Sequence, residues 1–273
     1  MATTPSQIKT VIMTGGTRGL GWEMAEALID AGHRVVITGQ QHGPHLGALQ
    51  DQLNQRAGAA HALALQADVA QWADCERVVQ QTLDTFGRVD GLVNNAGLGM
   101  RAIRDDFLQD PPLFWQAAPQ AFADIIQTNV VGPFFMARAC VPLMVAQGFG
   151  RVVNVSTSQS TMVRRGYSPY GPSKAGLEAL SVVWAKDLAG TGVTVNVLLP
   201  GGASATDMLP PNTPKDKLLP PQQMRAPIVW LMSDASSAHT GGRYSAKDWP
   251  EHLSAEAAAT CARSAHQEIP HIM

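Results

Sequence analysis

The residues TGGTRGLG, positions 14–21, lie directly after an apolar run and directly before a helical pattern, WEMAEALIDAG. Gly15 permits a tight turn out of the preceding strand, because glycine adopts positive φ without a steric penalty. Gly19 and Gly21 let the backbone approach a pyrophosphate and let the helix pack closely on the sheet. The helix N-terminus offers unpaired N–H groups and a positive dipole end to phosphate. This setting predicts the dinucleotide-binding end of a βαβ unit.

Outward from this turn, the chain alternates short β-rich runs with longer helical patterns. Most of the runs are continuously apolar, as in strands of a parallel sheet that are buried on both faces. Repeated units of this length predict a single-domain, doubly wound (Rossmann) α/β fold with helices on both faces of a parallel sheet. Right-handed crossovers place the strand C-termini on one edge, where ligands bind. The expected strands are 9–15, 34–39, 61–69, 89–97, 150–157 and 193–202, and the expected helices are 20–31, 45–57, 72–86, 119–147 and 171–190.

The composition favours a globular protein and argues against nucleic-acid-binding, disulfide-rich, zinc-binding and membrane-spanning classes. With 273 residues, of which 45% are hydrophobic and 15% charged, the chain can bury a sizeable core. The net charge of −2 argues against nucleic acid or an acidic membrane surface as the main partner. Cys75, Cys140 and Cys261 are widely spaced, which fits neither a disulfide framework nor a zinc site, so no metal is expected. Because the N-terminus has no apolar leader and no run of about 18 apolar residues occurs, we expect a soluble, cytoplasmic protein that spans no membrane.

No segment has the composition of an interdomain linker. Irregular stretches at 98–118 and 203–221 each follow a predicted strand end, where substrate loops are more common than linkers. After residue 248 the sequence becomes Ala-rich and short-helical. We therefore predict a catalytic domain over residues 1–248 and a C-terminal tail over residues 249–273, packed on the body or on a neighbouring subunit.

Further motifs follow the glycine turn in a fixed order: NNAG at 94–97, TNVVG at 128–132, Tyr170-x-x-x-Lys174 and PGG at 200–202. Together with the G-x-x-x-G-x-G spacing of the turn, they resemble the short-chain dehydrogenase/reductase family over most of the chain. A weaker match, LMSDASSAHTGG at 231–242, resembles the family's last helix and its entry into a seventh strand, which implies a seven-stranded sheet. The resemblance implies an oxidoreductase that transfers hydride between a nicotinamide cofactor and a ketone or secondary alcohol.

The second predicted strand ends VITGQQHG and lacks the carboxylate that selects NAD by binding the ribose hydroxyls. Arg18, inside the glycine turn, is within reach of a 2′-phosphate, and in the family a basic residue here usually accompanies NADP. Gln40 stands where the family often has an arginine just after the strand. We favour NADP(H) over NAD(H). The resemblance implies cofactor contacts from Gly15, Thr17, Arg18, Gly19, Leu20, Gly21, Gln40, Asp68, Val69, Asn94, Asn95, Ala96, Gly97, Tyr170, Lys174, Pro200 and Gly201, with Asp68 at the adenine.

Tyr170 and Lys174 lie four residues apart, so a helix places them side by side on one face. A free phenol has a pKa of about 10 and is a poor base at neutral pH. A nearby ammonium lowers that pKa, which makes the tyrosine a workable general acid–base. The lysine can also hold the cofactor ribose. The upstream motifs disfavour the alternative, an exposed pair without a role.

The resemblance implies a serine or threonine at the end of the fifth strand that binds the substrate oxygen. The local sequence is VNVSTSQS, and the family's usual spacing back from Tyr170 arrives at Thr157. Ser156 and Ser158 stay alternatives, although strand alternation points Ser156 and Thr157 to opposite faces. Asn129, in TNVVG, matches the family asparagine that orders a water linked to the lysine. Its alternative role is to satisfy backbone groups inside a helix.

Arginines occur in two segments that follow predicted strand ends. The first segment contains Arg101, Arg104 and Trp115, and the second contains Arg164, Arg165 and Tyr167. A bidentate clamp on a carboxylate or phosphate is one interpretation. Solvated arginines paired with acids such as Asp105 and Asp106 are the other. The hypothesis is a polar or anionic hydroxy or keto substrate, bound by Arg164, Arg165, Tyr167 and Trp115.

The final strand reads TGGRYSAKDWP, where the family more often has an acidic residue and two glycines. The resemblance implies a homo-oligomer, a tetramer or a dimer, that uses this region. Two rival functions are a non-catalytic dinucleotide-binding regulator and a same-fold epimerase or dehydratase. The intact Tyr170–Lys174 pair argues against the regulator, and a net change in NAD(P)H absorbance during turnover excludes the epimerase or dehydratase.

Overall fold

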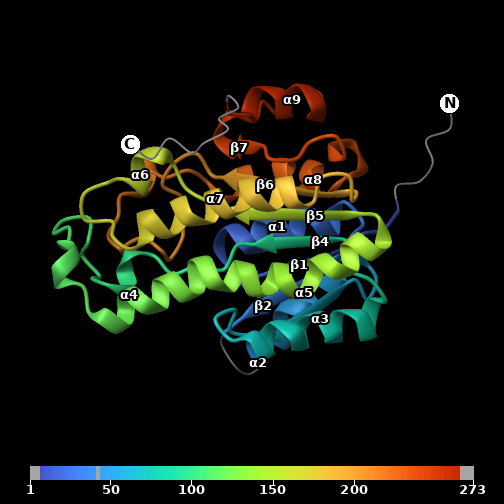
Figure 1. Ribbon diagram of the computed structural model, residues 1–273, viewed down its shortest axis with the longest axis horizontal. Helices are drawn as coiled ribbons and strands as arrows, with labels where there is room; N and C mark the ends of the chain where they lie inside the picture. Colours follow the sequence, from blue (N-terminus) through green and yellow to red (C-terminus); the bar gives the residue numbers. More distant parts are fainter. Residues whose placement is uncertain (1–6, 41–43, 265–273) are drawn as a thin grey trace.

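The structure is a computed structural model that describes residues 7–40 and 44–264. Within these residues, seven parallel strands form one sheet in the order β3-β2-β1-β4-β5-β6-β7 (Figure 1). The chain starts at the centre, runs outward to β3, and then crosses back to β4 beside β1, which confirms the doubly wound fold. The strands are β1 (Thr10–Met13), β2 (Arg34–Gly39), β3 (Ala62–Gln66), β4 (Gly91–Asn94), β5 (Gly150–Val155), β6 (Val193–Leu199) and β7 (Arg243–Ser245).

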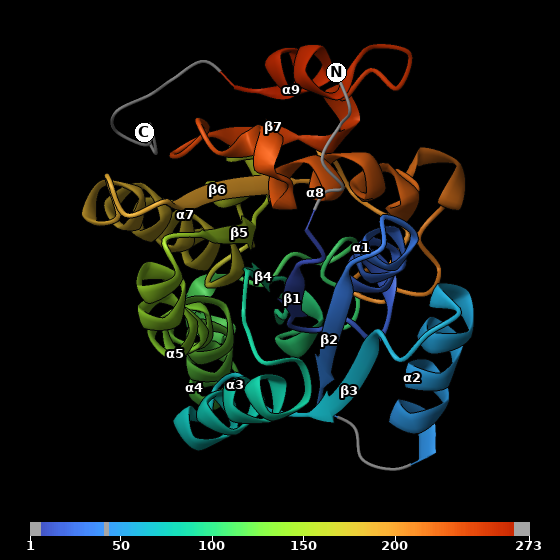
Figure 2. The same ribbon diagram turned by 90° about the vertical axis from the view of Figure 1, so that its right-hand side faces the viewer.

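Helices cover both faces of the sheet, as predicted (Figure 2). One face carries α1 (Gly19–Asp30), α2 (Pro44–Ala57) and α8 (Arg225–Met232). The other carries α3 (Trp72–Phe86), α4 (Pro119–Ile126), α5 (Gly132–Gln147) and α7 (Tyr170–Asp187). The short helices α6 (Gln159–Met162) and α9 (Ala255–Ala262) lie after β5 and after β7.

Each central strand contributes side chains to two separate cores. In β1, Val11 and Met13 pack under α1 and α8, whereas Ile12 packs under α3 and α5. The division follows from the period of two in a strand, because successive side chains point to opposite faces. It explains why the strands read as continuous apolar runs rather than as alternating ones.

Five of the six expected strands end earlier than the sequence predicts, whereas β2 ends at Gly39 as predicted. β1 ends at Met13 rather than at residue 15, and β4 ends at Asn94 rather than at residue 97. The residues that follow turn away from the ladder and bind one another, since Asn95 Nδ2 donates to the carbonyl oxygens of Thr14 (3.0 Å) and Gly15 (2.9 Å).

The helix predicted over residues 119–147 is interrupted by a π-helical turn, Gln127–Val131, between α4 and α5. Such turns insert one residue into a helix and occur often at functional sites. By length and composition alone, the stretch Pro119–Gln147 is apolar enough to cross a membrane, since an 18-residue window within it reaches a mean hydropathy of 1.5. In the structure it packs on the sheet and buries Met136, Cys140 and Met144 in the core under α3.

The described part of the predicted tail packs on the body of the protein. Trp249, Ala258 and Ala262 belong to the core that also contains α1 and α8. The Ser264 amide donates to the Arg243 carbonyl oxygen at 2.8 Å, so the chain returns to β7. The division of the chain at residue 248 stays a prediction, and residues 265–273 of the predicted tail lie outside the described residues.

Candidate active site

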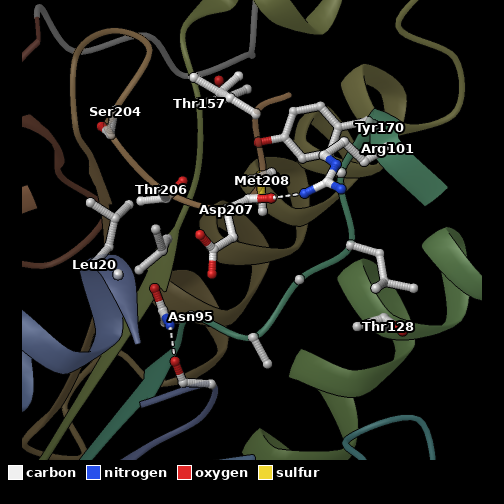
Figure 3. A pocket seen from close by; sticks show the side chains of 18 of the residues that line it. Leu20, Asn95, Arg101, Thr128, Thr157, Tyr170, Ser204, Thr206, Asp207 and Met208 are labelled. Carbon is white, nitrogen blue, oxygen red and sulfur yellow. Dashed lines mark hydrogen bonds between the residues drawn. The ribbon is translucent and has the colours of Figure 1, made fainter. Parts of the chain in front are cut away.

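A cavity of about 850 Å³ opens at the carboxyl edge of the sheet. It runs from Leu20 and Asn95 at one end to Thr157 and Tyr170 at the other (Figure 3). At this edge the chain leaves the neighbouring strands β1 and β4 toward opposite faces of the sheet. This is the switch point at which doubly wound folds bind ligands. The predicted residues that line the cavity are Gly15, Thr17, Arg18, Gly19, Leu20, Gln40, Val69, Asn95, Ala96, Gly97, Ser156, Thr157, Ser158, Arg164, Tyr167, Tyr170, Lys174 and Pro200. The predicted residues outside its lining are Gly21, Asp68, Asn94, Trp115, Asn129, Arg165 and Gly201.

The three glycines of the turn have different roles. Gly15 has φ +63°, and a Cβ there would lie 2.9 Å from the Ala96 Cα. Gly19 also has positive φ, +57°, and lies against Thr206. A Cβ at Gly21 would lie 2.3 Å from the Gly15 carbonyl oxygen, a distance that real Cβ atoms do not reach. Gly15 and Gly19 therefore shape the cavity wall, whereas Gly21 lets α1 pack against the turn.

The N-terminus of α1 is open toward the cavity. Its N-cap residue, Arg18, is extended and makes no side-chain cap bond to the described residues, and the first turn contains no acidic residue. Gly19 and Leu20, the first two residues of the helix, line the cavity. The first N–H groups of a helix have no partner within it, so this end of α1 presents donors and a positive dipole end to the cavity.

Two predicted cofactor residues, Asp68 and Asn94, lie outside the lining of the cavity and make hydrogen bonds within the protein. Asp68 Oδ1 accepts a hydrogen bond from the Ala70 amide at 2.9 Å, which shapes the turn before α3. Asn94 is buried, and its Nδ2 donates to Asn154 Oδ1 at 2.8 Å. Asn154 in turn donates to Ser181 Oγ on α7 at 2.8 Å. This buried chain of polar groups fixes α7 on β4 and β5.

The three candidate hydroxyls at the end of β5 have different surroundings. The Ser156 amide still bonds the Leu198 carbonyl in the ladder, and its buried Oγ has no partner among the described residues. Thr157, the next residue, lines the cavity together with Tyr170, and its hydroxyl interacts with the Tyr170 phenol closely enough to lower the phenol pKa in part. Ser158 caps α6, where its Oγ accepts from the Thr161 amide at 3.3 Å. Thr157 is thus the hydroxyl that meets Tyr170.

Tyr170 and Lys174 lie in the first turns of α7 and both line the cavity. The buried Lys174 ammonium donates to the Val155 carbonyl oxygen at 2.9 Å. Burial lowers the pKa of Lys174 to about 8, while the charge of Glu178 partly raises it. Burial raises the pKa of Tyr170 to about 12, and the hydrogen bond with Thr157 partly lowers it. The expected lowering of the phenol pKa is therefore wrong for this structure, because desolvation outweighs the favourable interactions.

Asn129 lies in the π-helical turn and is completely buried. Its Oδ1 accepts from the Leu98 amide at 2.8 Å, and its Nδ2 donates to the Leu98 carbonyl at 2.9 Å and to Ser173 Oγ at 3.0 Å. The side chain therefore satisfies backbone groups, which is the alternative role that the sequence left open, and it joins the segment after β4 to α7. Its participation in a proton relay stays a prediction.

The far end of the cavity is largely apolar. Met100, Phe107 and Tyr167 form a buried cluster in which the rings of Phe107 and Tyr167 meet edge to face at 5.7 Å. Arg164 lies over the Tyr167 ring, 4.8 Å from its centroid, and lines the cavity. Arg165 and Trp115 are exposed outside the cavity, so the structure does not bring all four predicted substrate residues together.

Several lining residues were not singled out by the sequence analysis. One group of them belongs to the loop after β6 and includes Ser204, Thr206, Asp207, Met208 and Leu209. The only available signal was the position of the irregular stretch 203–221 after a strand end. Asp207 joins three segments, because its carboxylate pairs with Arg18 at 3.0 Å and its carbonyl accepts from Arg101 at 2.8 Å.

A protein-family model described as short chain dehydrogenase matches residues 9–217. The chain belongs to the short-chain dehydrogenase family. Among its relatives is the 3-oxoacyl-[acyl-carrier-protein] reductase of Synechocystis sp., which is 32% identical over 245 residues, 86% of this chain and 93% of that protein. Another is the 1,6-dihydroxycyclohexa-2,4-diene-1-carboxylate dehydrogenase of Pseudomonas putida, 32% identical over 199 residues, 73% of this chain and 68% of that protein.

The fold of this short-chain dehydrogenase has a solved counterpart. A putative short-chain alcohol dehydrogenase from Sinorhizobium meliloti 1021 superposes with a TM-score of 0.76 at 26% identity, covering 89% of this chain and 96% of that one. The family match and the relatives confirm the predicted family and make the protein an enzyme of the dehydrogenase/reductase class, which acts on CH–OH groups and the corresponding carbonyls.

Proposed function

We propose that this short-chain dehydrogenase interconverts a ketone and a secondary alcohol with a nicotinamide cofactor, and that Tyr170 is its general acid–base. The observation that carries the proposal is the position of the Thr157 hydroxyl beside the Tyr170 phenol, close enough to lower the pKa of that phenol, in the lining of one cavity. These two groups lie in the same cavity as the glycine turn. A substrate oxygen bound between the two hydroxyls would therefore lie where both a proton and a hydride can be exchanged.

The cavity fits a dinucleotide. The open N-terminus of α1 suits the pyrophosphate, and Gly15, with φ +63°, lines the cavity beside it. At the other end, the buried hydroxyl of Ser204 lines the cavity and has no partner among the described residues, so it can bind a polar group of a ligand. A bound nicotinamide supplies or accepts the hydride at the reacting carbon.

We propose NADP(H) rather than NAD(H) as the cofactor. The Arg18 side chain is 72% exposed beside the phosphate-binding turn, and its pairing with Asp207 is an exposed ion pair, worth about 0–1 kcal/mol. A doubly charged 2′-phosphate is a stronger partner for the guanidinium than one exposed carboxylate. Gln40, at the end of β2, presents no negative charge to that phosphate.

The residues of the chain perform the proton chemistry in this proposal. Thr157 donates a hydrogen bond to the carbonyl oxygen, and Tyr170 delivers the proton that the oxygen needs as it becomes a hydroxyl. With a pKa of about 12, the phenol is protonated at neutral pH, which favours carbonyl reduction. In the reverse direction the phenolate forms, and the Lys174 ammonium stabilises it by its charge.

The substrate we propose has an apolar body and a polar or anionic group. Met100, Phe107 and Tyr167 suit the body, whereas Arg101 and Arg164, which also line the cavity, suit an anion at its margin. The relatives support two such classes, because one is named for a 3-oxoacyl carrier substrate and another for a cyclic carboxylate.

The test is a screen of 3-oxoacyl thioesters and cyclic hydroxy or keto carboxylates with NADPH and NADH, followed by the absorbance of the reduced nicotinamide. A net absorbance change that requires Tyr170 supports the proposal. Turnover of substrate without a net change would favour an epimerase or dehydratase. Binding of cofactor without any turnover would favour the regulator. If Arg164→Ala leaves KM for the best anionic substrate unchanged, the proposed role of Arg164 is wrong.

We also propose a cytoplasmic homo-oligomer, a tetramer or a dimer. Exposed apolar side chains on α5 and α7, such as Phe134 (45%) and Val183 (52%), are available to be covered by another subunit. Light scattering of the purified full chain measures the oligomeric state, and a monomer at micromolar concentration would contradict this expectation.

A further inference from the structure

Arg243, the first residue of β7, connects two parts of the candidate site that lie far apart in the sequence. Its Nε donates to both carboxylate oxygens of Glu178 on α7, at 3.1 Å and 3.0 Å. Its Nη2 donates to the backbone carbonyl oxygen of Thr157 at 2.8 Å. The side chain is only 21% exposed, so these charge-assisted bonds are shielded from solvent.

The hydrogen bond from Arg243 to the Thr157 carbonyl oxygen holds the backbone between the end of the sheet ladder and the start of α6. The last ladder bond of this strand is made by the Ser156 amide, and the next regular contact is the cap that Ser158 provides for α6. Thr157 lies between them. Threonine is branched at Cβ and has few χ1 rotamers, so the direction of its hydroxyl follows the orientation of its backbone. A group that holds the Thr157 carbonyl therefore also aims the Thr157 hydroxyl.

The bond to Glu178 supports the same geometry from the helix. Glu178 follows Lys174 by four residues and Tyr170 by eight, so all three lie on one face of α7. Glu178 is 7% exposed and its side chain pairs with Arg243, which offsets the cost of burying its charge. One guanidinium thus binds both the helix that carries Tyr170 and the backbone that carries Thr157.

We propose that Arg243 is a positioning residue for the reaction, which holds the Thr157 hydroxyl against the Tyr170 phenol by fixing the Thr157 backbone relative to α7. The inference rests on the proposed function, in which these two hydroxyls bind the substrate oxygen. Arg243 itself does not line the cavity and acts through Thr157.

The first test is kinetic and uses Arg243→Met, Thr157→Ala and the double variant in the full-length protein. Arg243→Met should lower kcat about 10- to 100-fold and leave the cofactor Kd within about twofold, because only the reacting geometry is lost. In the Thr157→Ala background the same substitution should lower kcat less than about threefold, because the two changes remove one interaction. If the double variant lost kcat by the full product of the two single losses, the two residues would act independently and the proposal would be overturned. Arg243→Lys, which cannot bind both partners with a planar fork, should restore kcat only in part.

A second readout does not require activity. The chain has three tyrosines, so ring-¹³C-labelled tyrosine gives three signals that Tyr→Phe substitutions assign. Thr157→Ala should move the Tyr170 Cζ signal by removing the hydroxyl that interacts with the phenol. Arg243→Met should move it in the same direction, and the double variant should move it no further. A Tyr170 signal that responds to Thr157→Ala but not to Arg243→Met would overturn the proposal even if the wild-type protein reduced no carbonyl, and so separates it from the proposed function.

Two controls separate positioning from general stability. Arg225→Met removes ion pairs to Glu23, Glu26 and Asp30, none of which lines the cavity, and should lower the Tm without lowering kcat. A loss of kcat in Arg225→Met equal to that in Arg243→Met would overturn the proposal. Ser264→Ala removes only a 3.4 Å contact with Arg243 Nη1 and should leave kcat unchanged.

Discussion

The Lys174 ammonium lies 2.9 Å from the carbonyl oxygen of Val155, the last residue of β5, and donates a hydrogen bond to it. This bond ties the start of α7 to the strand whose next residues carry the candidate hydroxyls. It also holds the ammonium in a buried place, where desolvation lowers the pKa of Lys174 to about 8. The charge state of the site therefore changes just above neutral pH.

The first prediction concerns this titration. Below pH about 8 Lys174 is an ammonium, and above it the charge is lost, so kcat for carbonyl reduction should be level below that pH and fall above it. In Lys174→Arg the fall should disappear from the accessible range, because a guanidinium stays charged. The measurement is the pH dependence of kcat for both proteins. If kcat of Lys174→Arg fell over the same pH range, the fall would have to come from the titration of another group.

The second prediction concerns the phenol. Tyr170→Phe removes the proton donor without removing the ring and should lower kcat about 10²- to 10⁴-fold. The cofactor Kd, measured by nucleotide fluorescence, should stay within a few-fold. Tyr167→Phe is the matched control, since Tyr167 packs edge to face on Phe107 and its hydroxyl has no proposed part in the chemistry. Equal losses in the two variants would contradict the assignment.

The third prediction distinguishes the three hydroxyls. Thr157→Ala should lower kcat about 10²-fold, the usual effect of losing one donor to a developing oxyanion, whereas Thr157→Ser should retain most activity. Ser158→Ala removes the cap of α6 and should lower the free energy of unfolding by about 1 kcal/mol with little change in kcat. If Ser156→Ala caused the largest loss of kcat, the substrate oxygen would lie on the other side of the strand end.

The fourth prediction concerns the choice of cofactor. Arg18→Ala should lower kcat/KM for NADPH about tenfold and leave kcat/KM for NADH within about twofold, because only the 2′-phosphate loses a charged partner. Asp207→Asn frees Arg18 from its ion pair and should raise the affinity for NADPH slightly. Equal losses with both cofactors would indicate that Arg18 binds the pyrophosphate instead.

The fifth prediction concerns the glycine turn and uses stability alone. Gly21→Ala places a methyl group 2.3 Å from the Gly15 carbonyl oxygen and should lower the free energy of unfolding by about 1–3 kcal/mol. Gly47→Ala, in the first turn of α2 with nothing within 4 Å of the added Cβ, should raise it by about 0.5–1 kcal/mol. Urea denaturation measures both, and a neutral Gly21→Ala would contradict the close packing of α1 on the turn.

Much of the fold followed from local patterns. The apolar runs predicted six of the seven strands, β1 to β6, because a strand buried on both faces has to be apolar along its whole length. The strand ends were placed up to a few residues too late, since residues such as Thr14 and Asn95 leave the ladder only to bind each other across the sheet. The π-helical turn at Asn129 could not be predicted, because it depends on contacts with Leu98 and Ser173.

The sequence by itself determined the glycine turn, the spacing of Tyr170 and Lys174 and the strand that precedes Thr157, because these depend on neighbours within one or two helical turns. The tertiary structure alone decided the rest. It placed Thr157 rather than Ser158 against the phenol, and burial reversed the expected direction of the Tyr170 pKa. It also brought Arg243 to the Thr157 carbonyl, 86 residues away in the chain, because β7 pairs with β6, which itself pairs with β5. Desolvation and long-range pairing depend on how the whole chain packs, and no local pattern contains them.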